Sequence, residues 1–154
     1  MSTIKLEAGT IQTLLDTELN SLANNDAALD SAEYDNATNL YEFAAFELYV
    51  DFVSAPTAGP TIELYMIPSL DGTNYGDGDG TPLAQINTFV GAFDVRATTA
   101  AMRLNLAIPS AMGAPNLAPL LPVKYKALIY NKSGQAFPAS GSTLKMLPYR
   151  RQVV

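Results

Sequence analysis

From residue 40 onward, hydrophobic and polar residues alternate in short segments, and this period of two is typical of strands with one buried face. In the segment LYEFAAFELYVDF (residues 40–52), Phe46, Leu48, Val50 and Phe52 alternate with charged residues and tyrosine. Later segments repeat this strand-like character. The six predicted strands are residues 40–52, 59–68, 84–97, 100–109, 123–134 and 142–152.

Prolines lie almost entirely at the borders of these segments, where a residue without a backbone N–H does least harm to a ladder. Short strands separated by Gly, Pro, Asn and Asp turns, with no convincing helix between them, predict an all-β fold, an antiparallel jelly-roll-like β-sandwich. Residues 69–81 and 110–122 are longer than tight hairpins require. We therefore expect both to carry the chain from one sheet to the other.

The first 39 residues are less regular than the rest. Between residues 10 and 24, Ile11, Leu14, Leu15, Leu19 and Leu22 lie near helical spacing, and either a short helix or an extended arm fits them. A stretch from Ala28 to Tyr34 could form one edge strand. We expect residues 1–39 to be an N-terminal arm and residues 40–154 to be the sandwich, within one folded unit.

The composition narrows the function. The chain has 154 residues with no cysteine and no histidine, so it lacks the side chains that most often serve as general bases and transition-metal ligands. No apolar stretch approaches the roughly 20 residues of a membrane span, and no secretion signal begins the chain. We expect a soluble protein that is not an enzyme and that needs no cofactor or metal.

The net charge of −6 conceals two oppositely charged halves. Residues 1–95 contain all fifteen acidic residues and one lysine, which gives −14, whereas residues 96–154 contain eight basic residues and no acidic one, which gives +8. Such halves attract each other if they interleave in one sheet system, or attract neighbouring copies if they face outward. No dense basic run is present, so nucleic acid is not an expected partner.

The loop DGTNYGDGDGT (residues 71–81) is the strongest local candidate for a site. Its Asp71, Asn74, Asp77 and Asp79 could bind calcium, but their spacing is not that of an EF-hand, and Asp-Gly pairs are favoured as turns. Tyr75 has no strand to pack on, so we expect it to contact a partner or cover a sheet edge. Together, Tyr75, Asp77 and Asp79 form the contact set of an alternative carbohydrate-reading loop.

A catalytic carboxylate pair is a weaker hypothesis. Glu47 and Asp51 share a predicted strand face, but four residues along a strand span about 13 Å, which exceeds the separations of glycosidase pairs. An enzyme would instead need convergent acids from Glu42, Glu63 and Asp94, and no pattern selects among them.

The C-terminal sequence LPYRRQVV allows two interpretations. Arg150 and Arg151 could blunt an edge strand against aggregation. They could equally dock the tail on an acidic neighbour through guanidinium–carboxylate pairs.

The segments PSLDGTNY (residues 68–75) and NKSGQAFPASGSTL (residues 131–144), with flanking sequence from about residue 15 to Tyr149, resemble small virion proteins of tailed bacteriophages and related prophages. The resemblance implies a jelly-roll cement or decoration protein. Such a protein binds the major capsid protein on the outer surface of the head and usually assembles as a homotrimer. A tail or baseplate-associated carbohydrate-binding module is the alternative.

Overall fold

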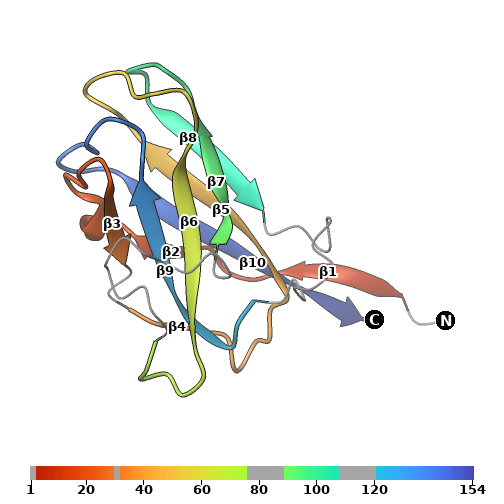
Figure 1. The fold of residues 1–154 in the computed structure, drawn as a ribbon. Coiled ribbons are helices and arrows are strands. Elements are labelled where there is room, and N and C mark those ends of the chain that lie inside the picture. The colour runs from red at the N-terminus through yellow and green to blue at the C-terminus, as the bar shows by residue number, and fades with distance from the viewer. Residues whose placement is uncertain (1–2, 30–31, 76–88, 108–120) are drawn as a thin grey trace.

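A computed structural model of the chain describes residues 3–29, 32–75, 89–107 and 121–154 (Figure 1). Within these ranges the chain forms ten strands and one turn of 3-10 helix, η1, at Thr17–Leu19. The strands are β1 (Ile4–Ala8), β2 (Gln12–Leu15), β3 (Asp26–Leu29), β4 (Tyr34–Asp35), β5 (Phe43–Val50), β6 (Gly59–Ser69), β7 (Phe89–Val95), β8 (Met102–Ala107), β9 (Lys124–Asn131) and β10 (Thr143–Val153).

The strands pair as one long antiparallel hairpin that has been rolled up. Strands β1 and β2 pair with β10, β3 and β4 pair with β9, β5 pairs with β8, and β6 pairs with β7. Rolling this nested hairpin also brings β10 beside β5 and β9 beside β6. The result is two facing sheets, β1-β10-β5-β8 with β2 on β10, and β3-β9-β6-β7 with β4 on β9. This arrangement confirms the predicted jelly-roll-like β-sandwich.

The two connections expected to cross between sheets differ. Strands β6 and β7 are neighbours in one sheet, so the prediction that residues 69–81 cross between sheets is wrong. Those residues belong instead to the connection at the tip of the rolled hairpin. Strands β8 and β9 lie in different sheets, so the connection that contains residues 110–122 does cross, as predicted.

Residues 10–24 do not form a helix beyond the single turn η1. Leu14 and Leu15 are both buried at the end of β2, and Leu19 is buried in η1. Their spacing resembles a helix because a strand end and a tight turn each direct leucines into the same core. The extended-arm alternative describes β1 and β2 better, whereas the predicted edge strand is split into β3 and β4, both paired with β9.

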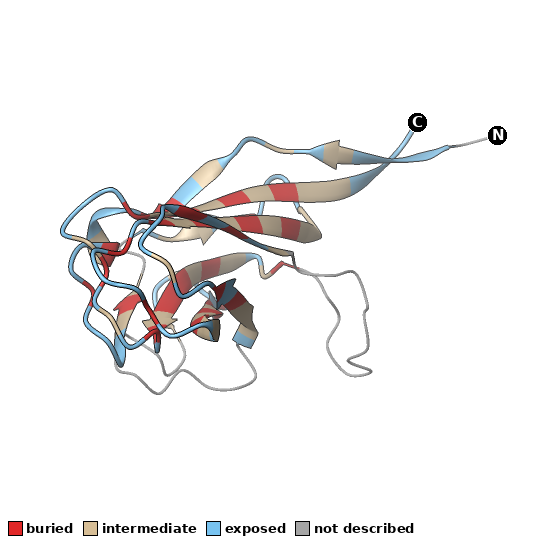
Figure 2. Ribbon diagram, turned by 90° about the horizontal axis from the view of Figure 1, so that it is seen from above, coloured by how far each residue is buried: buried red, intermediate tan, exposed pale blue. Residues whose placement is uncertain are grey.

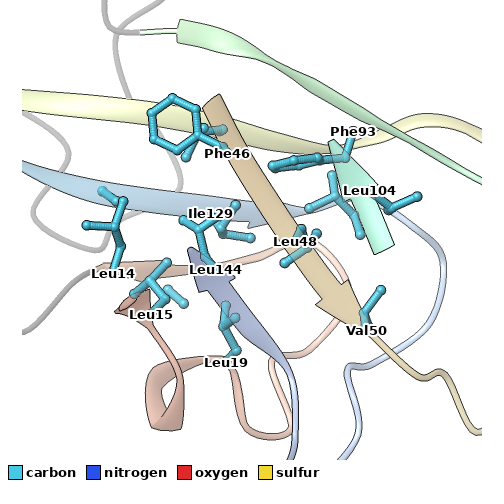
Figure 3. Close-up of a cluster of buried hydrophobic side chains, with 14 of the residues drawn as sticks. Leu14, Leu15, Leu19, Phe46, Leu48, Val50, Phe93, Leu104, Ile129 and Leu144 are labelled. Carbon is cyan, nitrogen blue, oxygen red and sulfur yellow. The ribbon is translucent and has the colours of Figure 1, made fainter. Parts of the chain in front are cut away.

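The core lies between the two sheets and comes from alternate residues of each strand. Figure 3 shows Phe46, Leu48 and Leu144 from one sheet facing Phe93 and Ile129 from the other. Burying each such side chain contributes roughly 1.5–3 kcal/mol, so the period-two pattern is the main source of stability. The red bands of Figure 2 mark the same alternation along the strands.

The ion pairs join the acidic half of the chain to the basic half. Each described pair links a residue before position 64 with a residue after position 102. They are Glu7–Arg150, Glu33–Lys124, Asp35–Lys124, Glu42–Arg151, Glu47–Arg103 and Glu63–Lys132. The nested pairing requires this because it places strands of the first half beside strands of the second. Of the two alternatives that the sequence left open, the described ion pairs correspond to the one in which the charged halves interleave in one sheet system.

A buried amide holds the end of the sandwich where β9 finishes. The Nδ2 of Asn131 donates to the carbonyls of Leu22, Ala23 and Gln135 at 3.2, 3.1 and 2.8 Å. Its Oδ1 accepts from the backbone N–H and hydroxyl of Ser133 at 3.0 and 2.7 Å. The side chain thus ties the segment before β3 to the turn after β9. A fully satisfied buried network of this kind fixes one arrangement of the chain.

We expect Asn131→Leu to lower the free energy of unfolding by about 3 kcal/mol, because it leaves buried carbonyls without a donor. Denaturant unfolding measures this effect. The control Asn105→Leu changes an exposed asparagine of β8 and should alter stability by less than about 0.5 kcal/mol. Equal losses in the two variants would contradict the role given to Asn131.

Candidate interaction surface

The described part of the glycine-rich loop is a self-contained turn. Asp71 Oδ1 accepts from the backbone N–H groups of Thr73 and Asn74, both at 2.8 Å, and Asp71 Oδ2 accepts from Asn74 Nδ2 at 2.7 Å. These bonds, led by the Asn74 backbone, hold the pKa of the Asp71 carboxyl well below its usual range. Asp71 and Asn74 therefore serve the turn. Asp77 and Asp79 lie outside the described residues.

Tyr75 returns the loop to the body of the protein. Its hydroxyl donates to the carboxylate of Glu33, and Lys124 Nζ donates to the same carboxylate at 3.0 Å. These two donors, Tyr75 first, lower the pKa of Glu33. Lys126 Nζ lies 5.1 Å from the centre of the Tyr75 ring. The tyrosine that was predicted to contact a partner or cover a sheet edge thus packs against its own chain beside β4 and β9.

A two-stranded ribbon extends from one sheet past the end of the sandwich. Strand β1 pairs with the last five residues of β10, from Tyr149 to Val153, and Thr3 is hydrogen-bonded to Val154 at the ribbon's far tip (Figures 1 and 2). Ile4, Leu6 and Val153 share one face of the ribbon and are 67%, 70% and 69% exposed. This ribbon is therefore an apolar surface that nothing in the described chain covers.

Two close contacts mark the point where the ribbon leaves the sandwich. A side chain at Gly9 would meet the ring of Tyr41 at 2.5 Å and Pro148 at 3.0 Å, so a larger residue would have to displace the Tyr41 ring. Pro148 is buried within β10, not at a segment border, and its carbonyl accepts from the Gly9 N–H at 2.8 Å. Because proline has no N–H to return, the edge strand is interrupted here and resumes as β2.

Arg150 and Arg151 bind carboxylates of their own chain. Arg150 Nε donates to Glu7 at 2.7 Å, and Arg151 Nε donates to Glu42 at 2.7 Å. The Arg151 guanidinium lowers the pKa of Glu42. Beyond Tyr149, β10 pairs with β1 alone, so Arg150 and Arg151 lie where no described strand pairs with the other edge of β10. The edge-strand interpretation of this tail stays a prediction, and the two arginines tie β10 to Glu7 of β1 and to Glu42 beside β5.

A hollow on the sandwich lies on the same side of the sheet as the exposed apolar residues of the ribbon. It has a volume of about 210 Å³ and includes Ile11, Ala45 and Leu147 in its lining, with Glu47 and Lys145 on its polar side. Leu147 and Val153 are odd-numbered residues of one strand, so they point to the same side of the sheet. Ile11 is 61% exposed. Hollow and ribbon thus lie on one side of the sheet, with Tyr149 and Arg151 of β10 between them, and this side is called here the apolar face.

Of the carboxylates considered for catalysis, Glu42 lies beside one sheet, whereas Glu63 and Asp94 lie on the paired strands β6 and β7 of the other. Glu42 lies beside β5 with Arg151, whereas Glu63 lies on the other sheet with Lys132 Nζ at 2.8 Å and the Tyr65 hydroxyl at 2.7 Å. Burial, together with the Glu63 bond, raises the pKa of Tyr65 to about 12. Asp94 is exposed on β7. Within the described ranges, no cluster of three or more acidic residues is placed to hold a metal ion. The same residues include no helix long and apolar enough to cross a membrane.

Comparison with known proteins adds little to this picture. No protein-family model matches the chain, and no curated protein matches it. Among solved structures, one described as a non-crystalline cellulose specific carbohydrate-binding module, CBM28, is similar with a TM-score of 0.28 and 10% identity. That match covers 79% of this chain and 60% of the other, so the chain spans less than two thirds of that structure's length.

The sequence prediction of the apolar face was incomplete. It named Arg150 and Arg151 but omitted the strand that lies beside them. The signal was present, because Ile4 and Leu6 alternate with Lys5 and Glu7 in the sequence IKLEA. Five residues with period two are weak evidence alone, and only the pairing with β10 distinguishes this strand from an irregular end.

The lowered pKa values of Glu33 and Glu42 predict acid sensitivity. A carboxyl whose folded pKa is depressed stabilises the fold above its ordinary pKa of 4.5, and this contribution is lost as the pH falls through the lowered value. We expect the melting temperature to fall below about pH 4.5. In Glu33→Gln/Glu42→Gln the fall should be shallower than in the control Asp51→Asn/Asp94→Asn, as measured by thermal circular dichroism. Parallel pH curves for the two double variants would refute this assignment.

The turn at Asp71 yields a separate, local prediction. We expect Asp71→Ala to speed amide hydrogen exchange at Thr73 and Asn74, because both N–H groups lose their acceptor. Exchange in β9 should be unchanged. If Thr73 and Asn74 keep their wild-type exchange rates in this variant, Asp71 does not hold the turn.

Proposed function

We propose that this chain is a structural virion protein of the capsid decoration type, which binds the outer surface of a phage head through its apolar face. The observation that carries the proposal is the ribbon, where Ile4, Leu6 and Val153 are each about two-thirds exposed. Fully burying one such side chain contributes roughly 1.5–3 kcal/mol, most of which the isolated chain does not gain.

The ribbon is also a weak structure by itself. A two-stranded ribbon in water is marginally stable, and it becomes stable when a third strand or an apolar surface covers it. The ion pairs of Arg150 and Arg151 hold it in an extended form that suits docking. A surface that is ordered but uncovered is characteristic of an adhesive protein.

The sequence supports a virion setting for this adhesion. The resemblance to small phage virion proteins rests on residues 68–75 and 131–144, and in the fold these are hydrogen-bonded turns. The partner in this proposal is the major capsid protein. Repeated copies on a shell also gain from multivalency, because each weak contact holds its neighbours in place.

Binding to shells that lack this protein tests the proposal. We expect Ile11→Asn/Val153→Asn to weaken binding at least roughly tenfold, because two apolar side chains of the apolar face become polar. The matched control is Val53→Asn/Leu70→Asn, which changes two fully or largely exposed apolar residues elsewhere. Co-sedimentation of labelled protein with the shells gives the affinity of each variant.

The control should bind as tightly as the wild type. Wild-type protein that does not bind the shells would refute the proposed function. Equal binding by the two double variants would show that the apolar face is not the docking surface.

A further inference from the structure

The outer edge of β1 carries unpaired backbone groups. Thr3 and Val154 exchange two backbone hydrogen bonds at 2.9 Å, and the Gly9 N–H donates to Pro148 at 2.8 Å. In an antiparallel pair such bonded positions alternate, so the odd-numbered residues of β1 face β10. The N–H and C=O groups of Ile4, Leu6 and Ala8 therefore point to the opposite edge. No strand of the described chain pairs with that edge.

The charges of β1 are arranged to select one antiparallel register with a second copy. Edge pairing requires the outward-pointing, even-numbered residues of two copies to lie opposite one another. With Leu6 opposite Leu6 of the second copy, Lys5 lies opposite Glu7, and the contact occurs twice by symmetry. A shift of two residues one way places Lys5 opposite Lys5, and a shift the other way places Glu7 opposite Glu7. Like charges directly opposite are destabilising, so only the centred register is favoured.

We propose that two copies of this chain join through the β1 edges in this register, which forms a continuous four-stranded sheet from β10, β1 and their counterparts. This pairing deepens the proposed function, on which it rests, by naming one self-contact of the adhesive protein. Its symmetry is two-fold, so the contact joins two copies and not the three that the sequence resemblance implies.

The local chemistry suits the pairing. Lys5 makes no ion pair among the described residues, whereas Glu7 already binds Arg150 at 2.7 Å. In the joined sheet Lys5 gains a carboxylate, and Glu7 lies between two cations. Lys5 and Glu7 lie in a non-hydrogen-bonded pair, where opposed side chains approach most closely. Ile4 and Leu6 of both copies share one face, so the apolar face of each copy is extended by that of the other.

Complementary charge reversal tests the register. The variant Lys5→Glu places two glutamates opposite two glutamates in a self-pair, and Glu7→Lys places two lysines opposite two lysines. Mixed together, the two variants again oppose Glu and Lys at both contacts. Sedimentation equilibrium of the full chain should show dimers for the wild type, dimerisation weakened at least roughly tenfold for each variant alone, and near wild-type affinity for the mixture.

The control Arg96→Glu makes the same charge change at an exposed residue outside the ribbon and should dimerise as the wild type does. Recovery in the mixture separates the register from any damage to the ribbon, since Glu7→Lys also removes the pair with Arg150. A wild type that stays monomeric, a trimer insensitive to Lys5→Glu, or a mixture that does not recover would overturn the pairing.

Shell binding distinguishes this inference from the proposed function. A chain that binds shells as a monomer would refute the pairing and leave the proposed function standing. A dimer of the predicted register that does not bind the shells would refute the proposed function and leave the pairing standing.

Discussion

Nested antiparallel pairing is the constraint on which the rest of this molecule depends. Because the chain is a long hairpin rolled into two sheets, each described strand of the first half except β7 is held beside a strand of the second. Interleaving the halves converts a segregated sequence charge, −14 against +8, into ion pairs across neighbouring strands. Exposed ion pairs contribute little each, so their main effect is to favour the correct register over shifted ones.

The same pairing produces the ribbon. Both ends of the chain are the open ends of the rolled hairpin, and they continue as β1 and β10 beyond the last core residues (Figure 1). Past Tyr149, β5 no longer pairs with β10, and β1 is the strand of the described residues that still does. Ile4, Leu6 and Val153 are therefore exposed by topology, and the apolar face, the open β1 edge and the fastening arginines occur together at one end of the molecule.

The segments on which the expected resemblance to virion proteins rests have structural roles. Asn131 and Ser133 build the buried network at the end of β9, and Asp71 with Ser69 builds the turn after β6. Such turns require particular residues because their hydrogen bonds have strict geometry. Similar turns therefore produce short stretches of matching sequence that contain no catalytic group. A match that rests on such turns would reflect shared architecture and not shared chemistry.

The alternation of hydrophobic residues from position 40 onward was enough to predict the strands, the all-β class and the sandwich. The reason is that burial of one face of a strand leaves a period of two in the sequence itself. The leucines at 14, 15 and 19 suggested a short helix that is not present, because a strand end followed by a 3-10 turn has nearly the spacing of a helix. Tertiary structure alone decided three features. These are the sheet that each strand joins, the binding of Arg150 and Arg151 to Glu7 and Glu42, and the open edge of β1. Local patterns determine which face of a strand is buried, but only long-range pairing determines its neighbour.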